Sequence, residues 1–367
     1  MIHPNSYLPI EKVWENLSED PAHFIDVRSP SEFALDHIPG AINLPVLNDR
    51  EREIVGTIYK EDSGKAKRLG ARLISANISK ILIDIESIYL KDKDSGVRSP
   101  RFLIYCWRGG MRSGSLYTVM EMIGYRVQLL DKGYKSYRSW VNSYLQDGYL
   151  PEFLVLHGPS GSGKTEILER FSQKSIPVLN LESLANHKGS VLGRHISEGQ
   201  PSQKFFETKL VEVLRRFQNE KFLWIEGESR KIGSLTLPPR IYEGIQNGKK
   251  FWVEISREER AKRLAKEYNF PPDVIRPRIE LIKRYMKSEV YEEIVKELDS
   301  NQYESVAGLL LKEYYDPLYL SLKNKYSHGA WNLGGESIED LIEELEAIYM
   351  DFLPEKNQLI NKGYSDE

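Results

Sequence analysis

The segment Gly158-Pro159-Ser160-Gly161-Ser162-Gly163-Lys164-Thr165 determines the fold of the second half of this 367-residue chain. It follows an apolar stretch, residues 153–157, that predicts a buried strand, and it precedes a helical pattern over residues 165–171. The segment matches G-x-x-x-x-G-K-[ST], in which glycines let backbone N–H groups converge on phosphate oxygens. We therefore predict a phosphate-binding loop (P-loop) in an α/β domain. Its predicted phosphate contacts are Gly158, Ser160, Gly161, Ser162, Gly163, Lys164 and Thr165.

A loop of this kind usually works with an acidic residue at the end of a second buried strand, which helps to hold Mg²⁺. Residues 222–225 are apolar and lead into Glu226, so we predict Mg²⁺ on Thr165 and Glu226. A structural ion pair is the alternative role of this glutamate. Arg230 follows closely enough to meet an anion at the same strand end.

Regularly spaced arginines follow the next predicted strand, residues 251–255. Arg257, Arg260 and Arg263 recur every three residues at the start of a predicted helix. The pattern resembles the lid segments of small-molecule kinases, and a solvated helix face explains it nearly as well.

A domain boundary is predicted at residues 147–151, where glycine and proline interrupt the patterns on both sides. We assign residues 1–148 to a first α/β domain. Residues 149–367 form a P-loop NTPase-like α/β domain whose part beyond Arg257 is almost wholly helical. In the first domain, the charged residues 48–72 and a longer helical pattern over residues 73–90 depart from the alternation of strands and helices. We interpret this departure as an insertion.

The composition excludes several classes of protein. With 40% apolar and 29% charged residues, the chain falls in the range of soluble globular proteins. No apolar run approaches the roughly 20 residues of a membrane span, and no secretory signal is visible, so we expect a cytoplasmic protein without a membrane partner. The net charge of -3 combines an acidic end, residues 334–367, with a mildly basic remainder. The single cysteine excludes an internal disulfide and any multi-cysteine zinc site.

That cysteine, Cys106, ends a predicted buried strand, residues 101–105, and precedes a predicted helix, residues 112–123. The connecting sequence Cys106-Trp107-Arg108-Gly109-Gly110-Met111-Arg112-Ser113 contains a glycine pair that permits a tight curl. Inward-pointing amides, a helix N-terminus and two arginines would favour a reactive thiolate and bind a tetrahedral anion. We predict Cys106, Arg108 and Arg112 as catalytic residues, with a buried, inert thiol as the alternative.

The segment Ile25-Asp26-Val27-Arg28-Ser29-Pro30-Ser31-Glu32-Phe33, followed by His37-Ile38-Pro39-Gly40-Ala41, strongly resembles the signature of the rhodanese (sulfurtransferase) family. In that family a cysteine carries a transferable sulfur as a persulfide, and the resemblance assigns this role to Cys106. One spacing differs from that family. Ordinary members place the closing arginine five residues after the cysteine, whereas Arg112 lies six residues after it. The longer spacing is that of phosphatases with the same fold. The wider loop suits a phosphate-sized group better than a bare sulfur.

From about residue 7 to residue 350, the chain resembles the tRNA 2-selenouridine synthase family. The blocks that carry this resemblance are residues 55–60, residues 105–110, residues 184–190 and Glu228-Ser229-Arg230. The resemblance implies a transferase that first alkylates the 2-thio group of the tRNA wobble uridine with geranyl diphosphate. Selenium from selenophosphate then replaces the S-geranyl group.

The same resemblance implies roles for the two loops. Cys106 would serve the selenium step, either carrying selenium covalently or stabilising the displacement, and its loop, with Arg108 and Arg112, would hold selenophosphate. The P-loop would grip the diphosphate of geranyl diphosphate, or that of ATP, and Mg²⁺ would help the diphosphate to leave. His187 and Ser190 lie in a polar loop and would contact an anion or the substrate, with an ordinary turn as the alternative.

The predicted contact with tRNA is the basic segment of residues 262–287. Phosphate contacts need a positive surface, and Tyr268, Phe270 and Tyr285 could stack on unpaired bases. An ordinary solvated helix surface is the alternative. No stable protein partner is predicted. The predicted RNA contacts are Lys262, Arg263, Lys266, Arg276, Arg278, Lys283 and Arg284.

Three other functions are compatible with parts of the sequence. The first is an ATP-dependent kinase or ATPase fused to a thiosulfate-type sulfurtransferase that acts on small molecules, and it predicts fast ATP turnover. The second is a phosphatase, which the Cys-x5-Arg spacing favours but Tyr105 disfavours, because such loops usually have histidine before the cysteine. The third is a noncatalytic module with a nucleotide-dependent switch, for which replacing Cys106 would leave activity intact.

Overall fold

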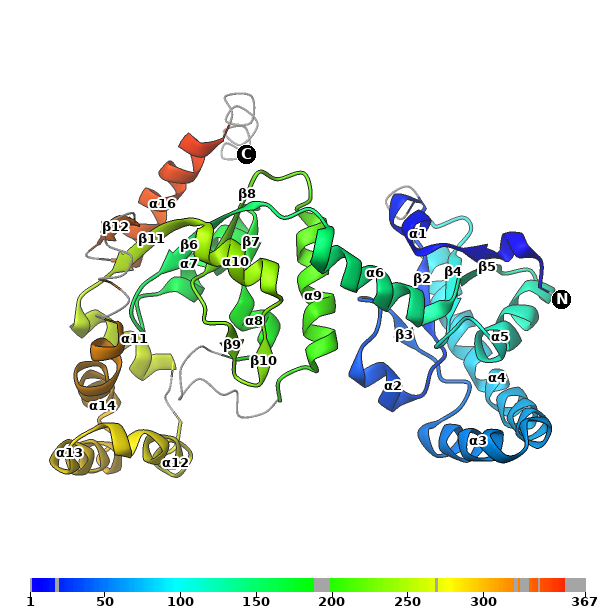
Figure 1. Cartoon of the computed structure of the whole chain (residues 1–367), viewed down its shortest axis with the longest axis horizontal. Coiled ribbons are helices and arrows are strands. Elements are labelled where there is room, and N and C mark those ends of the chain that lie inside the picture. The colour runs from blue at the N-terminus through cyan, green and yellow to red at the C-terminus, as the bar shows by residue number, and fades with distance from the viewer. Residues whose placement is uncertain are drawn as a thin grey trace. The chain divides into compact units, whose positions relative to one another are not determined.

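The computed structural model describes residues 2–16, 20–187, 199–267, 270–319, 323, 330–335 and 337–353. The chain forms two compact units, one of residues 1–149 with 201–212 and the other of residues 150–200 with 213–367. Each unit contains a five-stranded sheet covered by helices (Figure 1). Residues 201–212, which the sequence analysis placed in the second domain, pack with the first unit. Among the described helices, none is both long enough and apolar enough to cross a membrane.

The sheet of the first unit is parallel throughout. Its strand order is β1 (Tyr7–Leu8), β5 (Arg126–Leu130), β4 (Arg101–Tyr105), β2 (His23–Asp26) and β3 (Ile42–Asn43). β4 is the central strand and all five of its residues are buried, as its apolar sequence predicts. Because the carboxyl ends of parallel strands meet at one edge of a sheet, Cys106 lies at the edge where ligands usually bind. The helices of this unit are η1 (Pro4–Ser6), α1 (Ile10–Asn16), α2 (Pro30–Leu35), α3 (Asp49–Glu61), α4 (Ser63–Asp94), α5 (Met111–Met122) and α6 (Gly133–Asp147).

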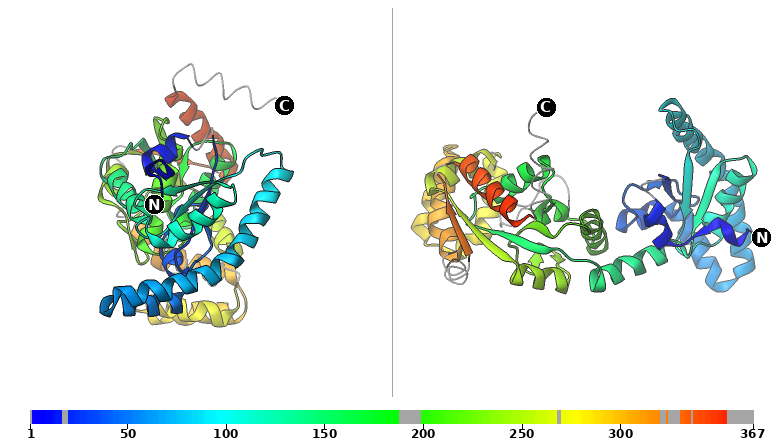
Figure 2. Two further views of the ribbon diagram at one scale, coloured as in Figure 1. Left: turned by 90° about the vertical axis from the view of Figure 1, so that its right-hand side faces the viewer. Right: turned by 90° about the horizontal axis from the view of Figure 1, so that it is seen from above.

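The charged residues 48–72 are helical. Asn48 caps α3 by accepting a hydrogen bond from the Glu51 amide, and Asp62 caps α4 in the same way from the Lys65 amide. The 32-residue α4 is seen along its length in Figure 2. One of its faces packs on the first unit's core, which includes Leu116 and Met120 of α5. The residues of that face are Ile74, Ile78, Ile81 and Ile85.

The sheet of the second unit is also parallel, with the order β12 (Ala330–Gly334), β11 (Lys249–Glu254), β6 (Glu152–His157), β8 (Phe222–Glu226) and β7 (Val178–Leu179). A short antiparallel pair, β9 (Lys231–Ile232) and β10 (Leu235–Thr236), stands apart from it. The prediction that the chain beyond Arg257 is almost wholly helical missed β12. This edge strand buries only Leu333, so its own sequence carries little strand signal, and pairing with β11 stabilises it.

The helices of the second unit form two groups. α7 and α16 contribute to the core that contains Trp224 and Phe251 of the sheet. The helices from α11 to α14 form a separate core around Leu264, Ile279 and Ile294, coloured yellow to orange in Figure 1. α9 (Gln203–Arg216) begins in the first unit and ends in the second. The bounds of the second unit's other helices are α7 (Lys164–Gln173), α8 (Leu181–Ala185), α10 (Pro239–Asn247), α11 (Arg257–Glu267), α12 (Pro272–Ile282), η2 (Lys283–Tyr285), α13 (Ser288–Asp299), α14 (Tyr303–Leu310), η3 (Leu311–Tyr315) and α16 (Ile338–Phe352).

Candidate functional site

The P-loop connects β6 to α7 and presents unpaired backbone N–H groups. The Ser162 amide donates to the Pro159 carbonyl at 3.2 Å, but the amides of residues 160, 161 and 163 donate no hydrogen bond within the described chain. Gly163 has φ +84°, and a Cβ on it would lie 2.0 Å from Cδ1 of Ile338, so only glycine fits. Free amides beside a helix N-terminus form an anion-binding site.

The two polar side chains that end the motif point in different directions. Lys164 extends over the loop and donates from Nζ to the carbonyls of Gly158 at 2.8 Å and Pro159 at 3.3 Å. Thr165 donates from Oγ1 to Oε2 of Glu182 at 2.9 Å. Glu182, on α8, is therefore the acidic residue in contact with the P-loop threonine, and the sequence analysis missed it.

Glu226 lies at the end of β8, as predicted, and is buried with 1% of its surface exposed. Its Oε2 accepts from the Leu181 amide at 2.8 Å, whereas its buried Oε1 has no hydrogen-bond partner among the described residues. Burial and the neighbouring Glu182 carboxylate raise the pKa of Glu226 to about 8, and the same two causes raise that of Glu228 to about 7. The P-loop thus adjoins carboxylates whose charges are poorly compensated.

This donor set fits Mg²⁺. Mg²⁺ usually binds one or two carboxylates together with substrate phosphates and water, rather than a cage made by the protein alone. The described residues contain no group of three or more His, Cys, Asp or Glu side chains that could hold a metal ion by themselves. The Thr165 hydroxyl, the Glu182 carboxylate and the unpartnered oxygen of Glu226 could hold the ion once a bound phosphate completes its coordination.

The arginines of α11 make ion pairs within the second unit. Arg260 is 5% exposed, donates to both carboxylate oxygens of Asp316 at 2.7 and 2.9 Å, and contacts the Ser160 carbonyl at 3.3 Å. Arg257 contacts the same Asp316, and Arg263 pairs with Glu166 of α7. Partial burial alone would raise the pKa of Asp316, but the hydrogen bond and charge of Arg260 hold it below its usual value. A solvated helix face therefore does not account for Arg260.

Cys106 follows β4 and is nearly enclosed, with 3% of its surface exposed. Its sulfur accepts a hydrogen bond from the hydroxyl of Ser113 at 3.2 Å, and its carbonyl accepts one from the Tyr134 amide at 2.8 Å. Within the described chain, the amides of residues 107–110 donate no hydrogen bond. The loop therefore has the unpaired amides of an anion cradle around a thiol that is almost covered. The sequence analysis did not single out Ser113, which lies in the first turn of α5.

The two predicted arginines of this loop occupy different environments. Arg108 is exposed at the loop surface. Arg112, in the first turn of α5, donates to Oε2 of Glu32 at 2.7 Å, and Arg52 contacts the same carboxylate at 3.3 Å. Partial burial alone would raise the pKa of Glu32, but the hydrogen bond and charge of Arg112 hold it below its usual value. The charge of Arg112 is thus neutralised next to the loop.

The polar residues at the end of β2 are structural. The guanidinium of Arg28 pairs with Asp26 at 2.6 Å, donates to the Asp36 carbonyl at 2.7 Å and lies 4.0 Å from the ring centroid of Tyr134. Arg28 is 1% exposed and Asp26 is fully buried. This part of the rhodanese-like signature supports the sheet edge that carries the Cys106 loop.

The remaining predicted contacts are scattered. The His187 amide donates to the Glu182 carbonyl at 3.0 Å, which places His187 just after α8, whereas Ser190 lies outside the described residues. Arg230 is exposed between β8 and β9.

The predicted RNA contacts lie on α11, α12 and η2 of the second unit. Lys262, Lys266 and Lys283 are exposed, as is Arg284, whose guanidinium lies 4.7 Å from the ring centroid of Tyr285. Arg276 and Arg278 are half-buried, and Arg276 pairs with Asp299. Tyr268 lies outside the described residues. The exposed lysines and Arg284 are thus the part of this set that is open to a phosphate backbone.

Comparison with known families finds a match in each half of the chain. Residues 10–139 match the Rhodanese-like domain. Residues 151–288 match the tRNA 2-selenouridine synthase AAA domain. The two matches cover both loops described above.

Curated relatives match most of the chain. A tRNA 2-selenouridine synthase from Pseudomonas putida (strain GB-1) is 30% identical over 334 residues, which cover 89% of this chain and 86% of the relative. The corresponding protein of Hydrogenovibrio crunogenus is 31% identical over 80% of this chain and 87% of the relative. That of Nitrosomonas europaea is 29% identical over 87% of this chain and 94% of the relative.

Proposed function

Because this chain belongs to the tRNA 2-selenouridine synthase family, we propose that it replaces the sulfur of 2-thiouridine at the tRNA wobble position by selenium, through an S-geranyl intermediate. It is an enzyme that modifies tRNA. The donors in this proposal are geranyl diphosphate and selenophosphate. The observation that supports two donor sites is the presence of two loops with unpaired amides, one beside Lys164 and one around Cys106.

The first step is assigned to the P-loop. The 2-thio sulfur attacks C1 of the geranyl group, the C1–O bond breaks, the diphosphate leaves with the bonding electrons, and N3 of the uridine releases its proton. The Lys164 ammonium and the amides of residues 160, 161 and 163 would bind the diphosphate and stabilise its developing charge. Lys164 must exchange its present carbonyl contacts for phosphate oxygens, which a flexible lysine side chain can do without moving the backbone.

Mg²⁺ would neutralise further charge on the leaving diphosphate. The Thr165 hydroxyl, Glu182 and the unpartnered oxygen of Glu226 are the groups that would hold it. Their arrangement explains why carboxylates crowd a loop that binds anions, since a dication between them and the phosphates would attract both.

The second step is assigned to the Cys106 loop. A thiocarbonyl sulfur leaves poorly, whereas the alkylated sulfur departs as geranylthiol. Selenium forms a bond to C2, the C2–S bond breaks, and the leaving sulfur takes up a proton, with the Cys106 thiol stabilising this displacement. When selenium attacks as selenophosphate, water then cleaves its Se–P bond and releases phosphate. The free amides of residues 107–110 and the exposed Arg108 would bind the donor anion.

Access to Cys106 requires movement of its own loop. The residue is 3% exposed, whereas Trp107 is 37% exposed and packs at 5.2 Å on the ring of Tyr134. A donor reaches the sulfur only when the loop of residues 107–110 shifts. Glycines at two of these four positions make that shift sterically cheap.

The proposal is tested by separating its two steps. Cys106→Ser should keep geranylation of 2-thiouridine tRNA and abolish selenation, because the sulfur serves only the second step. Lys164→Ala should lower geranylation by roughly 100-fold, because it removes the charge that binds the leaving diphosphate. Mass spectrometry of the wobble nucleoside, after reaction of each purified variant, measures both products.

Lys174→Ala is the matched control. This lysine follows α7, the helix that begins at Lys164, but it is exposed and pairs with Glu346. It should leave both products unchanged. Equal loss of both products in Cys106→Ser would refute the division between two loops, and geranylation that requires ATP would favour the kinase or ATPase alternative.

A further inference from the structure

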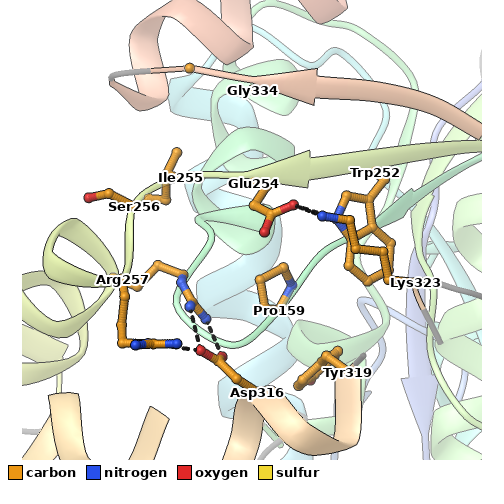
Figure 3. A pocket seen from close by; sticks show the side chains of 12 residues that line it. Pro159, Trp252, Glu254, Ile255, Ser256, Arg257, Asp316, Tyr319, Lys323 and Gly334 are labelled. Carbon is orange, nitrogen blue, oxygen red and sulfur yellow. Dashed lines mark hydrogen bonds and ion pairs between the residues drawn. The ribbon is translucent and has the colours of Figure 1, made fainter. Parts of the chain in front are cut away.

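A cavity of about 660 Å³ adjoins the P-loop in the second unit. It lies among the carboxyl ends of β11 and β12, the start of α11 and the segment after η3 (Figure 3). Its volume falls in the range of roughly 300–1,000 Å³ that is typical of small-molecule sites. The two steps proposed above assign no role to it.

The cavity is continuous with the phosphate loop. Pro159 belongs to the loop and also lines the cavity, where it lies at the centre of Figure 3. Tyr319 lines it too, with its hydroxyl 3.5 Å from Oγ of Ser160 and its ring centroid 6.0 Å from Nζ of Lys164. A ligand whose diphosphate occupies the P-loop would therefore have the rest of its structure next to these two residues.

The charged side chains in the cavity wall neutralise one another. Asp316 accepts from both Arg257 and Arg260. Figure 3 shows Arg257 and Asp316 beside Pro159. On the other side, Glu254 pairs with Lys323 and accepts from the indole N–H of Trp252 at 3.3 Å. The carboxylates of Asp316 and Glu254 thus already have partners within the wall. The surfaces left for a ligand are those of Pro159, Trp252, Ile255 and Tyr319.

We propose that this cavity binds the hydrocarbon tail of an isoprenyl diphosphate whose diphosphate lies in the P-loop. This inference rests on the proposed function and adds the place where the apolar half of the donor binds. Aromatic and aliphatic surfaces favour a branched hydrocarbon, and each methylene removed from water is worth about fourfold in affinity. A nucleobase would instead have to compete for the carboxylates of Asp316 and Glu254, which already have partners in the wall.

The test is equilibrium binding to the full chain with Mg²⁺ and without tRNA, by calorimetry. The probes are inorganic diphosphate, dimethylallyl diphosphate, geranyl diphosphate and ADP. Wild-type protein should bind geranyl diphosphate at least about tenfold more tightly than inorganic diphosphate, with dimethylallyl diphosphate in between. Tyr319→Ala should lower that preference, the ratio of the two affinities, by about fivefold or more.

Two further variants control for indirect effects. Tyr319→Phe keeps the ring and should keep the preference for geranyl diphosphate. Trp252→Phe tests the opposite wall with a substitution that retains an aromatic ring in the buried strand, and it should lower the preference for the longer chain. These two variants separate loss of apolar contact from loss of the Ser160 hydrogen bond or of folding.

Three results would overturn the inference. One is a wild-type affinity for geranyl diphosphate no greater than that for inorganic diphosphate. Another is a preference for geranyl diphosphate that neither Tyr319→Ala nor Trp252→Phe reduces. The third is that wild-type protein binds ADP more tightly than geranyl diphosphate and that Tyr319→Ala and Trp252→Phe lose this preference for ADP. Failure of the proposed function has a different signature, because the wild-type enzyme would then form no geranylated nucleoside in the tRNA assay.

Discussion

Gly133 shows how closely the Cys106 loop is packed. Its φ is +57°, and a Cβ on it would lie 2.2 Å from the Cys106 carbonyl oxygen and 2.6 Å from the Gly109 amide nitrogen. The next residue, Tyr134, donates its amide to the same Cys106 carbonyl. The position after β5 is therefore restricted to glycine by the backbone of the loop and not only by its own dihedral angle.

Gly133→Ala should abolish selenation of tRNA, because the added methyl group must displace the Cys106 backbone. Gly124→Ala is the matched control, since Gly124 has φ +88° but a Cβ added there would meet no atom within 4 Å. Both variants should lose about 1 kcal/mol of unfolding free energy from the left-handed conformation, and Gly133→Ala should lose more. Urea unfolding and nucleoside mass spectrometry measure the two effects. Equal selenation by both variants would contradict this packing argument.

Glu182 offers a second test at the residue scale. If it helps to hold Mg²⁺, Glu182→Gln should weaken diphosphate binding roughly tenfold when Mg²⁺ is present. Without Mg²⁺ the same variant should bind diphosphate more tightly than wild type, because one negative charge next to the loop is gone. Glu169→Gln, an exposed position on α7, should change neither affinity. Calorimetric titration with and without the metal distinguishes these cases, and a parallel loss in both conditions would exclude a metal role.

At the scale of elements, α4 shows how a helix is stabilised by one face. Its buried isoleucines recur at spacings of three and four residues, which places them on one side of the helix. The sequence predicts a helical pattern only from residue 73 to residue 90, whereas α4 extends from Ser63 to Asp94. Its first turn carries polar residues and depends on the Asp62 cap, so apolar periodicity does not reveal it.

Ile85 and Ile83 form a matched pair for testing that face. Ile85 is fully buried and Ile83 is 67% exposed on the same helix. Ile85→Ala should lower the unfolding free energy of the first unit by about 2–5 kcal/mol, because it leaves a cavity against α5 and the sheet. Ile83→Ala should change it by less than about 0.5 kcal/mol. Denaturant unfolding followed by circular dichroism checks both values, and similar losses would mean that α4 packs through a different face.

At the scale of the whole molecule, tRNA binding should depend on the exposed lysines of the second unit. Replacing both Lys266 and Lys283 by glutamate reverses two positive charges and should weaken tRNA binding. The slope of log K against log salt concentration should also become shallower, by roughly 0.9 for each phosphate that the variant no longer neutralises. The control reverses Lys80 and Lys91, which are exposed on α4 of the first unit. Filter binding over a range of salt concentrations gives the slopes. Equal slopes for the two double variants would show that net charge, and not this surface, governs binding.

Much of this protein could be predicted from local sequence. The P-loop and the Cys106 loop each connect a strand to a helix, as predicted, and β4, β6 and β8 lie where their apolar runs predict them. These features are encoded by contiguous residues, because an apolar run, a glycine turn and a helical pattern follow one another directly. The family also follows from motifs that can be read along the chain.

Tertiary structure decided which side chains meet at each loop. Thr165 and Glu182 are 17 residues apart, Arg260 and Asp316 are 56 apart, and Glu32 and Arg112 are 80 apart. Such contacts depend on strand order, since parallel sheets bring the ends of strands that are distant in sequence to one edge. Tertiary structure also decided β12, because this strand pairs with β11, which is distant in sequence. The near enclosure of Cys106 likewise depends on residues that surround it in space, and no local sequence pattern encodes it.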